Sequence, residues 1–119
     1  MIIEVLKSKL HQATVTGANI NYEGSISIDP FLYKKAGMFL HEKVDILNMN
    51  NGARFSTYII NGKESEICLN GAAARLVVAG DKVIIVAYTH IESKDAESWQ
   101  PKIVILGESN SIKENIPKA

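Results

Sequence analysis

The stretch YEGSISID, residues 22–29, contains a pair that could perform chemistry on the backbone itself. A serine hydroxyl can attack the carbonyl carbon of the residue before it, and Gly24, which has no Cβ, lets Ser25 make that approach at little steric cost. The pair also has an ordinary explanation, in which Gly24 adopts a positive φ in a turn and Ser25 begins a strand. Gly and Ser are both common, so the rest of the chain must decide between the two.

Three other segments place polar or small residues inside stretches whose pattern is otherwise that of buried strands. Each has an unremarkable interpretation by itself, because lysine on a strand is usually solvated, arginine usually pairs at the surface, and alanines usually pack closely. Their order along the chain, together with YEGS, is more informative than any one of them. The segments are KLH at 9–11, RFSTY at 54–58 and NGAAA at 70–74.

The first of these segments predicts a shared strand face. In KLH, strand alternation places Lys9 and His11 on one side and Leu10 on the other. The three histidines of the chain have no metal-ligand spacing with one another or with Cys68, so no metal site is expected.

Length and composition restrict the possible classes of protein. The 119 residues form one domain, and 46% hydrophobic and 22% charged residues are typical of a globular protein. Thirteen basic residues balance thirteen acidic ones, which argues against a nucleic-acid partner. No signal peptide, membrane-spanning run, P-loop, GxGxxG or GxSxG is present, and the single cysteine fits a reducing compartment, so a cytoplasmic protein is expected.

Short alternating apolar runs recur about every ten residues, which predicts a compact mainly β barrel or sandwich of about seven strands. A doubly wound α/β fold is disfavoured because no helical segment is long enough for its crossovers. The strand signals are IIEVLKSKL and ATVT, which together open the chain, followed by SISID, EKVDILNMN, ARFSTYII, SEICLN, KVIIVAY and a final KIVIL.

The connections between these runs carry their own signals. Asp29 is a good N-cap, Pro30 suits the first helical position and Gly37 suits the C-terminal cap, so a short helix is predicted over 30–36.

Asn-Gly pairs at 51–52 and 61–62 predict hairpin turns, the second within a hairpin spanning 59–70. GAN at 17–19 is interpreted as a break between strands. Brief helices are possible at 71–76 and 93–99, and the polar tail 107–119 is expected to fray.

Taken in order, KLH, YEGS, NGxRFSTY and NGAAA closely resemble the aspartate 1-decarboxylase family, small pyruvoyl-dependent enzymes of pantothenate biosynthesis. The resemblance runs from residue 1 to about 105 and includes AGDKVIIVAY and the late pair Trp99 and Pro101. It implies that 1–119 form a six- or seven-stranded double-psi β-barrel with a few short helices. It also implies a homotetramer with active sites between subunits.

The same resemblance implies that the chain cuts itself between Gly24 and Ser25, giving a β chain of 1–24 and an α chain of 25–119. Attack by the hydroxyl moves the acyl group from nitrogen to oxygen, and elimination and hydrolysis then leave a covalent pyruvoyl group at position 25. Backbone strain could supply about 1–3 kcal/mol toward the shift. A donor to the developing oxyanion could supply about 3 kcal/mol, and the family gives that role to the threonine matching Thr57.

The pyruvoyl ketone is then expected to form a Schiff base with L-aspartate and to accept electrons as carbon dioxide leaves, the task of pyridoxal phosphate elsewhere. Tyr58 matches the proton donor, and hydrolysis releases β-alanine. Lys9 and Arg54 match the cations that bind the two substrate carboxylates, with Arg54 suited to a bidentate contact. The other matching positions are substrate contacts at Thr57, Gly71, Ala72 and Ala73, and supporting residues at Tyr22 and Asn70.

Strict alternation puts Thr57 and Tyr58 on opposite faces of one strand. Both reach one pocket only if the strand twists or bulges, or if each serves the site of a different subunit. The sequence leaves both explanations open.

Two other functions remain possible. A non-catalytic β-barrel binding module would keep an intact 13.1 kDa chain. A pyruvoyl enzyme could instead act on another amino acid, although cations at 9 and 54 favour a dicarboxylate. The chain also departs from many relatives at Leu47, where they carry Trp, and in the 59–70 hairpin, which is about two residues shorter than in some. Neither departure is expected to touch the chemistry, although Leu47 could alter the packing of the pocket.

Overall fold

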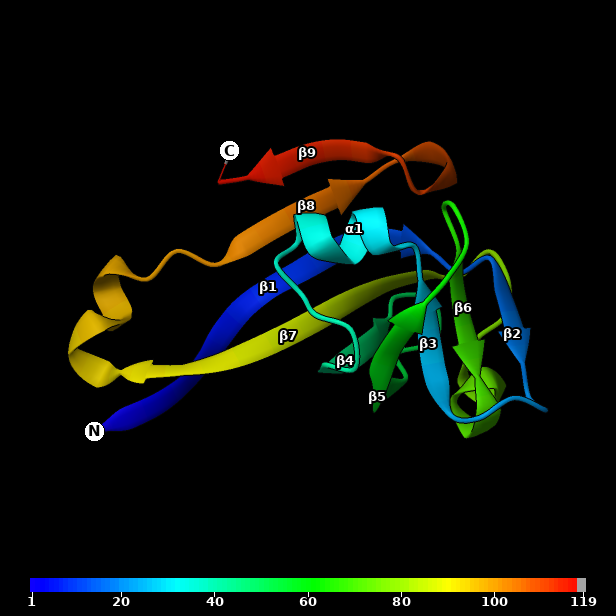
Figure 1. Ribbon diagram of the computed structural model, residues 1–119, viewed down its shortest axis with the longest axis horizontal. Helices are drawn as coiled ribbons and strands as arrows, with labels where there is room; N and C mark the ends of the chain where they lie inside the picture. Colours follow the sequence, from blue (N-terminus) through cyan, green and yellow to red (C-terminus); the bar gives the residue numbers. More distant parts are fainter. Residues whose placement is uncertain (118–119) are drawn as a thin grey trace.

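The computed structural model describes residues 1–117, and the predicted mainly β fold class is confirmed (Figure 1). Within these residues there are nine strands in place of the six or seven expected, joined by one short α-helix and three 3-10 helices. The strands are β1 (Ile2–Thr14), β2 (Gly17–Asn19), β3 (Ser25–Ile28), β4 (Lys43–Asn48), β5 (Arg54–Asn61), β6 (Ile67–Asn70), β7 (Lys82–Glu92), β8 (Lys102–Leu106) and β9 (Ile112–Ile116). The helices are α1 (Pro30–Lys35), η1 (Gly71–Leu76), η2 (Ser93–Ser98) and η3 (Glu108–Asn110).

The strands form one sheet in the order β2-β6-β3-β5-β4-β7-β1-β8-β9. Only Val15 and Thr16 separate β1 from β2 along the chain, although the two strands lie far apart in the strand order. The sheet must therefore curl round on itself, as a barrel requires. In Figure 1, β1 and β7 run side by side and extend together toward the N-terminal end of the molecule.

The first Asn-Gly prediction is confirmed and the second is wrong. Gly52 has a φ of 75° in the turn between β4 and β5, which pair antiparallel. After 61–62, however, the chain does not return along β5. Strand β3 lies between β5 and β6, parallel to the first and antiparallel to the second, so 59–70 is not a hairpin and residues 62–66 cross over β3.

Helix α1 forms where the capping residues predict it. The Asp29 side chain accepts a hydrogen bond from the Phe31 backbone N–H, Pro30 occupies the first turn, and Gly37 has a φ of 73° just beyond the end. The helix buries Leu32 and Tyr33 against the core, and its burial of only two side chains fits its length of six residues.

Two segments without strand signals also join the sheet. GAN at 17–19 forms β2, which pairs in parallel with β6, so interpreting it only as a break is wrong. The tail is ordered as far as it is described: β9 pairs antiparallel with β8, and the buried Asn110 donates to the backbone oxygens of Thr14 and Ser65. These bonds attach the tail to the barrel, while 118 and 119 lie outside the described residues.

Candidate functional site

Ser25 begins β3 directly opposite Asn70, the last residue of β6. The Ser25 side chain is 1% exposed. Its Oγ accepts a hydrogen bond of 3.0 Å from Asn70 Nδ2 and donates one of 3.0 Å to the backbone oxygen of Glu23. Because both bonds are made, the hydroxyl has a fixed direction beside the peptide bond that the sequence predicts it to attack.

Gly24 does not fulfil the ordinary role of a turn glycine. Its φ lies outside the left-handed region, in which Gly37, Gly52, Gly71 and Gly80 are found. A Cβ built on Gly24 would meet no atom within 4 Å. Neither a positive φ nor a clash at Cβ therefore accounts for this glycine, and its carbonyl is free of a neighbouring Cβ, as the predicted attack by Ser25 requires.

Gly71 is the glycine on which the local packing depends. Its φ is 68°, and a Cβ there would lie 2.7 Å from both the N and Cα atoms of Gly24 and 3.1 Å from the backbone oxygen of Tyr22. The start of η1 therefore contacts the segment that leads into Ser25. Ala72 and Ala73 follow, exposed and half-buried respectively. Five predicted residues thus gather around one peptide bond: Tyr22, Gly24, Ser25, Asn70 and Gly71.

The side chains of Thr57 and Tyr58 lie on opposite faces of β5, as strand alternation predicts. Exposed Arg54, Ser56 and Tyr58 alternate along it with half-buried or buried side chains, among them Thr57 and Ile59. Its pairing with β4 runs from Lys43 to Leu47 without a register shift. Because no bulge interrupts this pairing, Thr57 and Tyr58 point to opposite faces within one chain.

Tyr58 lies beside Ser25 in the sheet. Ile26 of β3 and Ile59 of β5 are partners in a parallel pair, and Ser25 and Tyr58 each come one residue earlier. Neighbouring strands are about 5 Å apart, so the two backbones are close. Arg54 lies four residues further along β5, roughly 13 Å away.

Lys9 is distant from Ser25 along the sheet. It belongs to a row in which Lys9 pairs with Val86, Val86 with Asp45, and Asp45 with Ser56. Three strand spacings separate Lys9 from β5, roughly 14 Å, and β3 is one strand further. Along the sheet, Lys9 is therefore farther from Ser25 than Arg54 is.

Lys9 and His11 lie half-buried on either side of the fully buried Leu10, as KLH predicts. The pKa of His11 is lowered, first by burial and second by the positive charge of Lys9. The imidazole is therefore biased toward its neutral form.

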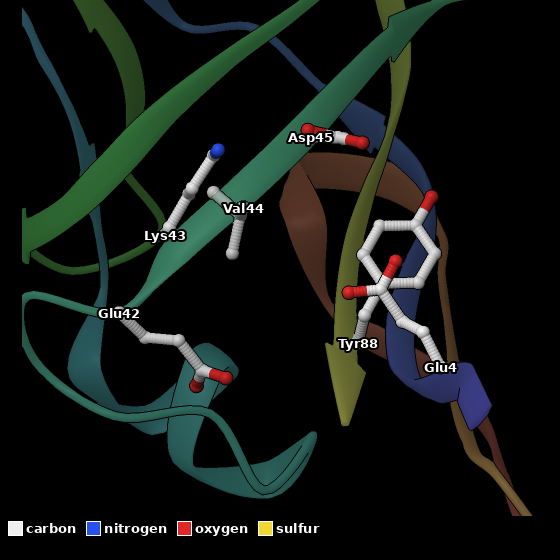
Figure 2. A pocket seen from close by; sticks show the side chains of 6 residues that line it. All are labelled: Glu4, Glu42, Lys43, Val44, Asp45 and Tyr88. Carbon is white, nitrogen blue, oxygen red and sulfur yellow. The ribbon is translucent and has the colours of Figure 1, made fainter. Parts of the chain in front are cut away.

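A surface hollow of about 560 Å³ has none of the predicted site residues in its lining but borders two of them, since its Lys43 is the cross-strand partner of Tyr58 and the charge of Arg54 acts on its Tyr88 (Figure 2). The pKa of its Tyr88 is raised first by burial and then by the nearby Asp45 carboxylate, which also accepts a 2.6 Å hydrogen bond from Ser56 Oγ. Three carboxylates make this hollow unsuited to a dicarboxylate substrate. It is lined by Glu4, Glu42, Lys43, Val44, Asp45 and Tyr88.

A smaller hollow of about 130 Å³ contains Arg54 and its cross-strand partner Leu47. Leu47 is therefore a neighbour of a predicted substrate-binding residue, at a position where a change in pocket packing is expected. In residues 1–117 no group of three or more His, Cys, Asp or Glu side chains could hold a metal ion. Among the helices of the same residues, none is long and apolar enough to cross a membrane.

Ser27 and Cys68 are absent from the predicted site but belong to its hydrogen-bond network. Asn70 Nδ2 also donates to Ser27 Oγ at 3.0 Å, and Cys68 Sγ donates to Asn70 Oδ1 at 3.5 Å. The sequence signal was available, since Ser27 and Cys68 are polar residues alternating with apolar ones on two strands, but only the register shows that they meet.

Comparison with known proteins gives one consistent result. Residues 1–113 match the profile of a family described as aspartate decarboxylase. An aspartate 1-decarboxylase of Campylobacter hominis is 59% identical over 96% of this chain and 100% of its own length. Those of Bdellovibrio bacteriovorus and Clostridium beijerinckii are 54% and 53% identical, over 96% of this chain and 92% and 94% of their own lengths.

Proposed function

Because the chain belongs to the aspartate decarboxylase family, we propose that it converts L-aspartate to β-alanine and carbon dioxide with a pyruvoyl group made from its own Ser25. Family membership makes the protein a lyase that decarboxylates aspartate, and it removes the non-catalytic binding module from consideration. The proposal adds self-cleavage at Gly24-Ser25, the covalent cofactor and the roles of individual residues.

The observation that carries the proposal is the local geometry at 24–25. A glycine with no conformational or packing requirement precedes a serine whose buried hydroxyl is held by Asn70 Nδ2 and the Glu23 oxygen. These residues fit the formation of a pyruvoyl group, because the carbonyl of Gly24 is unhindered and the nucleophile is oriented. Thr57 is the proposed donor to the oxyanion that forms on the Gly24 carbonyl.

When formed, the pyruvoyl group supplies a ketone that condenses with the substrate amine and takes up the electrons left by departing carbon dioxide. The protein must then return a proton to the substrate carbon. Tyr58 is the proposed donor, supported by its position beside Ser25 in the parallel pair β3–β5. Its exposed face is shared with Arg54, the proposed bidentate contact to a substrate carboxylate.

Lys9 is the proposed second cation, and its distance from Ser25 along the sheet supports a site completed by another subunit. We therefore propose a homotetramer whose active sites lie between subunits, with Thr57 and Tyr58 facing different parts of that interface. Backbone groups of Gly71, Ala72 and Ala73 are proposed to contact the substrate, supported by the position of Gly71 against Gly24. A cytoplasmic location and a role in pantothenate biosynthesis complete the proposal, the former supported by a single cysteine.

A substrate and carbonyl-reagent assay tests this function. The purified protein is incubated separately with L-aspartate and L-glutamate. It is expected to release β-alanine from L-aspartate at least about tenfold faster than it forms product from L-glutamate, because the one additional methylene of glutamate is enough for that discrimination. Pretreatment with phenylhydrazine, which reacts with ketones, should abolish the activity. Full activity after that treatment would contradict a pyruvoyl mechanism, and preference for glutamate would reassign the substrate.

A further inference from the structure

Ser25, Ser27, Cys68 and Asn70 form a polar quartet on one face of the antiparallel pair β3–β6. The serines alternate with the fully buried Ile26 and Ile28, and Asn70 and Cys68 alternate in the same way with Leu69 and Ile67. Their register is direct, with Ser25 opposite Asn70 and Ser27 opposite Cys68. The quartet is therefore built by the two strands themselves and not by a loop.

Asn70 is the centre of the quartet. Its side chain is 3% exposed, and all its hydrogen bonds go to the other three members. Nδ2 donates to Ser25 Oγ and Ser27 Oγ, each at 3.0 Å, while Oδ1 accepts from Cys68 Sγ at 3.5 Å. One amide thus contacts the predicted nucleophile and two residues that have no assigned role.

The amide of Asn70 has two possible orientations, and its neighbours decide between them. With Oδ1 turned toward the serines, both hydroxyls could donate to it, because a hydroxyl can be donor or acceptor. Ser25 would then no longer donate to the Glu23 oxygen, and Nδ2 would face sulfur, which is a poor acceptor. Cys68 favours the orientation in which Oδ1 faces its sulfur and Nδ2 faces the serines, because its S–H can donate but its sulfur accepts only weakly.

The surroundings of Cys68 keep that donor in place. The pKa of its thiol is raised, first by burial and then by the charge of Glu66, so the sulfur stays protonated. Gly17 of β2 is its partner on the other side, and a Cβ built on Gly17 would lie 3.7 Å from Sγ, at ordinary contact distance. The thiol thus has Gly17, without a side chain, on the β2 side and the Asn70 amide as its hydrogen-bond partner.

We propose that Cys68 and Ser27 are positioning residues for self-cleavage: Cys68 orients the Asn70 amide so that its N–H and not its carbonyl faces Ser25 Oγ, and Ser27 holds the amide in place by accepting the second N–H of Nδ2. This inference rests on the proposed function, since it concerns the step that makes the pyruvoyl group. It adds two residues that do not touch the scissile bond.

The orientation matters for both halves of the cleavage chemistry. In the acyl shift, Ser25 Oγ bonds to the Gly24 carbonyl carbon, the C–N bond breaks, and the hydroxyl proton ends on the released amine. An N–H donor at Oγ stabilises the oxygen as it loses that proton.

In the elimination, the Cα proton of residue 25 is removed and the Cβ–Oγ bond breaks, so that Oγ departs within the Gly24 carboxylate. One water then hydrolyses the dehydroalanine left at position 25, which gives the pyruvoyl group and releases ammonia. The same N–H donor stabilises the departing carboxylate.

A cleavage time course tests the proposal. Full-length chains made by cell-free synthesis are followed by intact mass for conversion of 1–119 into 1–24 and 25–119. Cys68→Ala and Cys68→Val are expected to slow cleavage roughly three- to tenfold, the size of one ordinary hydrogen bond. Cys68→Ser, whose hydroxyl donates more strongly, is expected to cut at least as fast as the native chain. Ser27→Ala is expected to slow cleavage by a similar factor, and Asn70→Asp, which has no N–H, to slow it further.

The conservative variant separates orientation from packing. Valine fills the space of the thiol without a donor and serine keeps the donor in a smaller side chain, so a packing role would slow Cys68→Ser and spare Cys68→Val. Melting temperatures of all variants check that the barrel is intact. Native-rate cleavage by Cys68→Ala and Cys68→Val, or a slow Cys68→Ser, overturns this inference and leaves the proposed function standing. A native chain that never cuts overturns both.

Discussion

The hydroxyl of Ser25 is the one nucleophile that the proposed chemistry requires, and it is buried, hydrogen-bonded twice and adjacent to an unhindered glycine. Replacing it should therefore stop maturation without disturbing the fold. Ser25→Ala is expected to remain one uncut, inactive chain on a denaturing gel. As a matched control, Ser98→Ala removes an exposed hydroxyl that only donates to Asp95 O, and it should cut and turn over normally. A fully active Ser25→Ala variant would contradict the account.

Tyr58 should act after cleavage and not during it. Tyr58→Phe is expected to mature fully but to lose turnover of aspartate by about 10²- to 10⁴-fold, the usual contribution of a positioned proton donor. Intact mass and β-alanine release, measured on the same sample, separate the two effects. Tyr33→Phe is the control, because that buried hydroxyl only donates to Asn61 Oδ1 and its loss should reduce stability by about 1 kcal/mol while leaving turnover unchanged. Slow cleavage by Tyr58→Phe would assign the hydroxyl to a different step.

The lowered pKa of His11 makes a prediction about stability. A histidine whose pKa is lower in the folded than in the unfolded chain stabilises the fold above the unfolded pKa of 6.5, and that contribution is lost as the pH falls toward the folded pKa. The native chain should therefore lose more melting temperature between pH 7.5 and 5.5 than His11→Gln. Thermal unfolding at both pH values measures the difference, and an equal loss in both proteins would contradict it.

At the scale of elements, the junction between β6 and η1 holds the cleavage segment. Gly71→Ala should be destabilising for two reasons: its φ of 68° disfavours a side chain, and the new Cβ would approach Gly24 to 2.7 Å. Gly80→Ala shares the first cost, with a φ of 97°, but meets no atom within 4 Å. Urea unfolding should show a cost of about 1–2 kcal/mol for Gly80→Ala. It should show a larger cost for Gly71→Ala, together with slower cleavage. Equal losses of unfolding free energy in the two variants would contradict a role for the Gly71–Gly24 contact.

Local signals predicted some elements well and failed where the partner is distant. The capping residues of α1 and the Asn-Gly turn between β4 and β5 act within a few residues, so the sequence contains all that they need. β2 and β9 have weak patterns of their own and exist because β6 and β8 offer free edges. The crossover after 61–62 depends on β3, more than thirty residues earlier, which no turn signal encodes.

The site shows the same division. Roles for Lys9, Ser25, Thr57 and Tyr58 could be predicted from ordered motifs, and alternation correctly assigned Thr57 and Tyr58 to opposite faces. The network of Ser27 and Cys68 with Asn70 could not, because it requires the register of β3 against β6. The separation of Lys9 from Ser25 likewise appears only once the strand order is known.

At the scale of the whole molecule, that separation predicts that subunits share their sites. Lys9→Ala should mature but bind substrate poorly, and Ser25→Ala should lack the pyruvoyl group while keeping Lys9. Co-expressed, the two variants are expected to recover up to about a quarter of native turnover, because random assembly joins an intact Ser25 to a neighbour's Lys9 at that fraction of interfaces. Co-expression of Ser25→Ala with the double variant Lys9→Ala/Ser25→Ala is the control and should stay inactive. No recovery in the mixed assembly would place both residues in one subunit's site.

The mass of the purified native protein under denaturing, reducing conditions tests the central claim most directly. Two species are expected, the chain 1–24 ending in an ordinary carboxylate and the chain 25–119 beginning with a ketone that adds one hydrazide label. An unbroken chain of 119 residues that takes up no label and still releases β-alanine from aspartate would contradict the account.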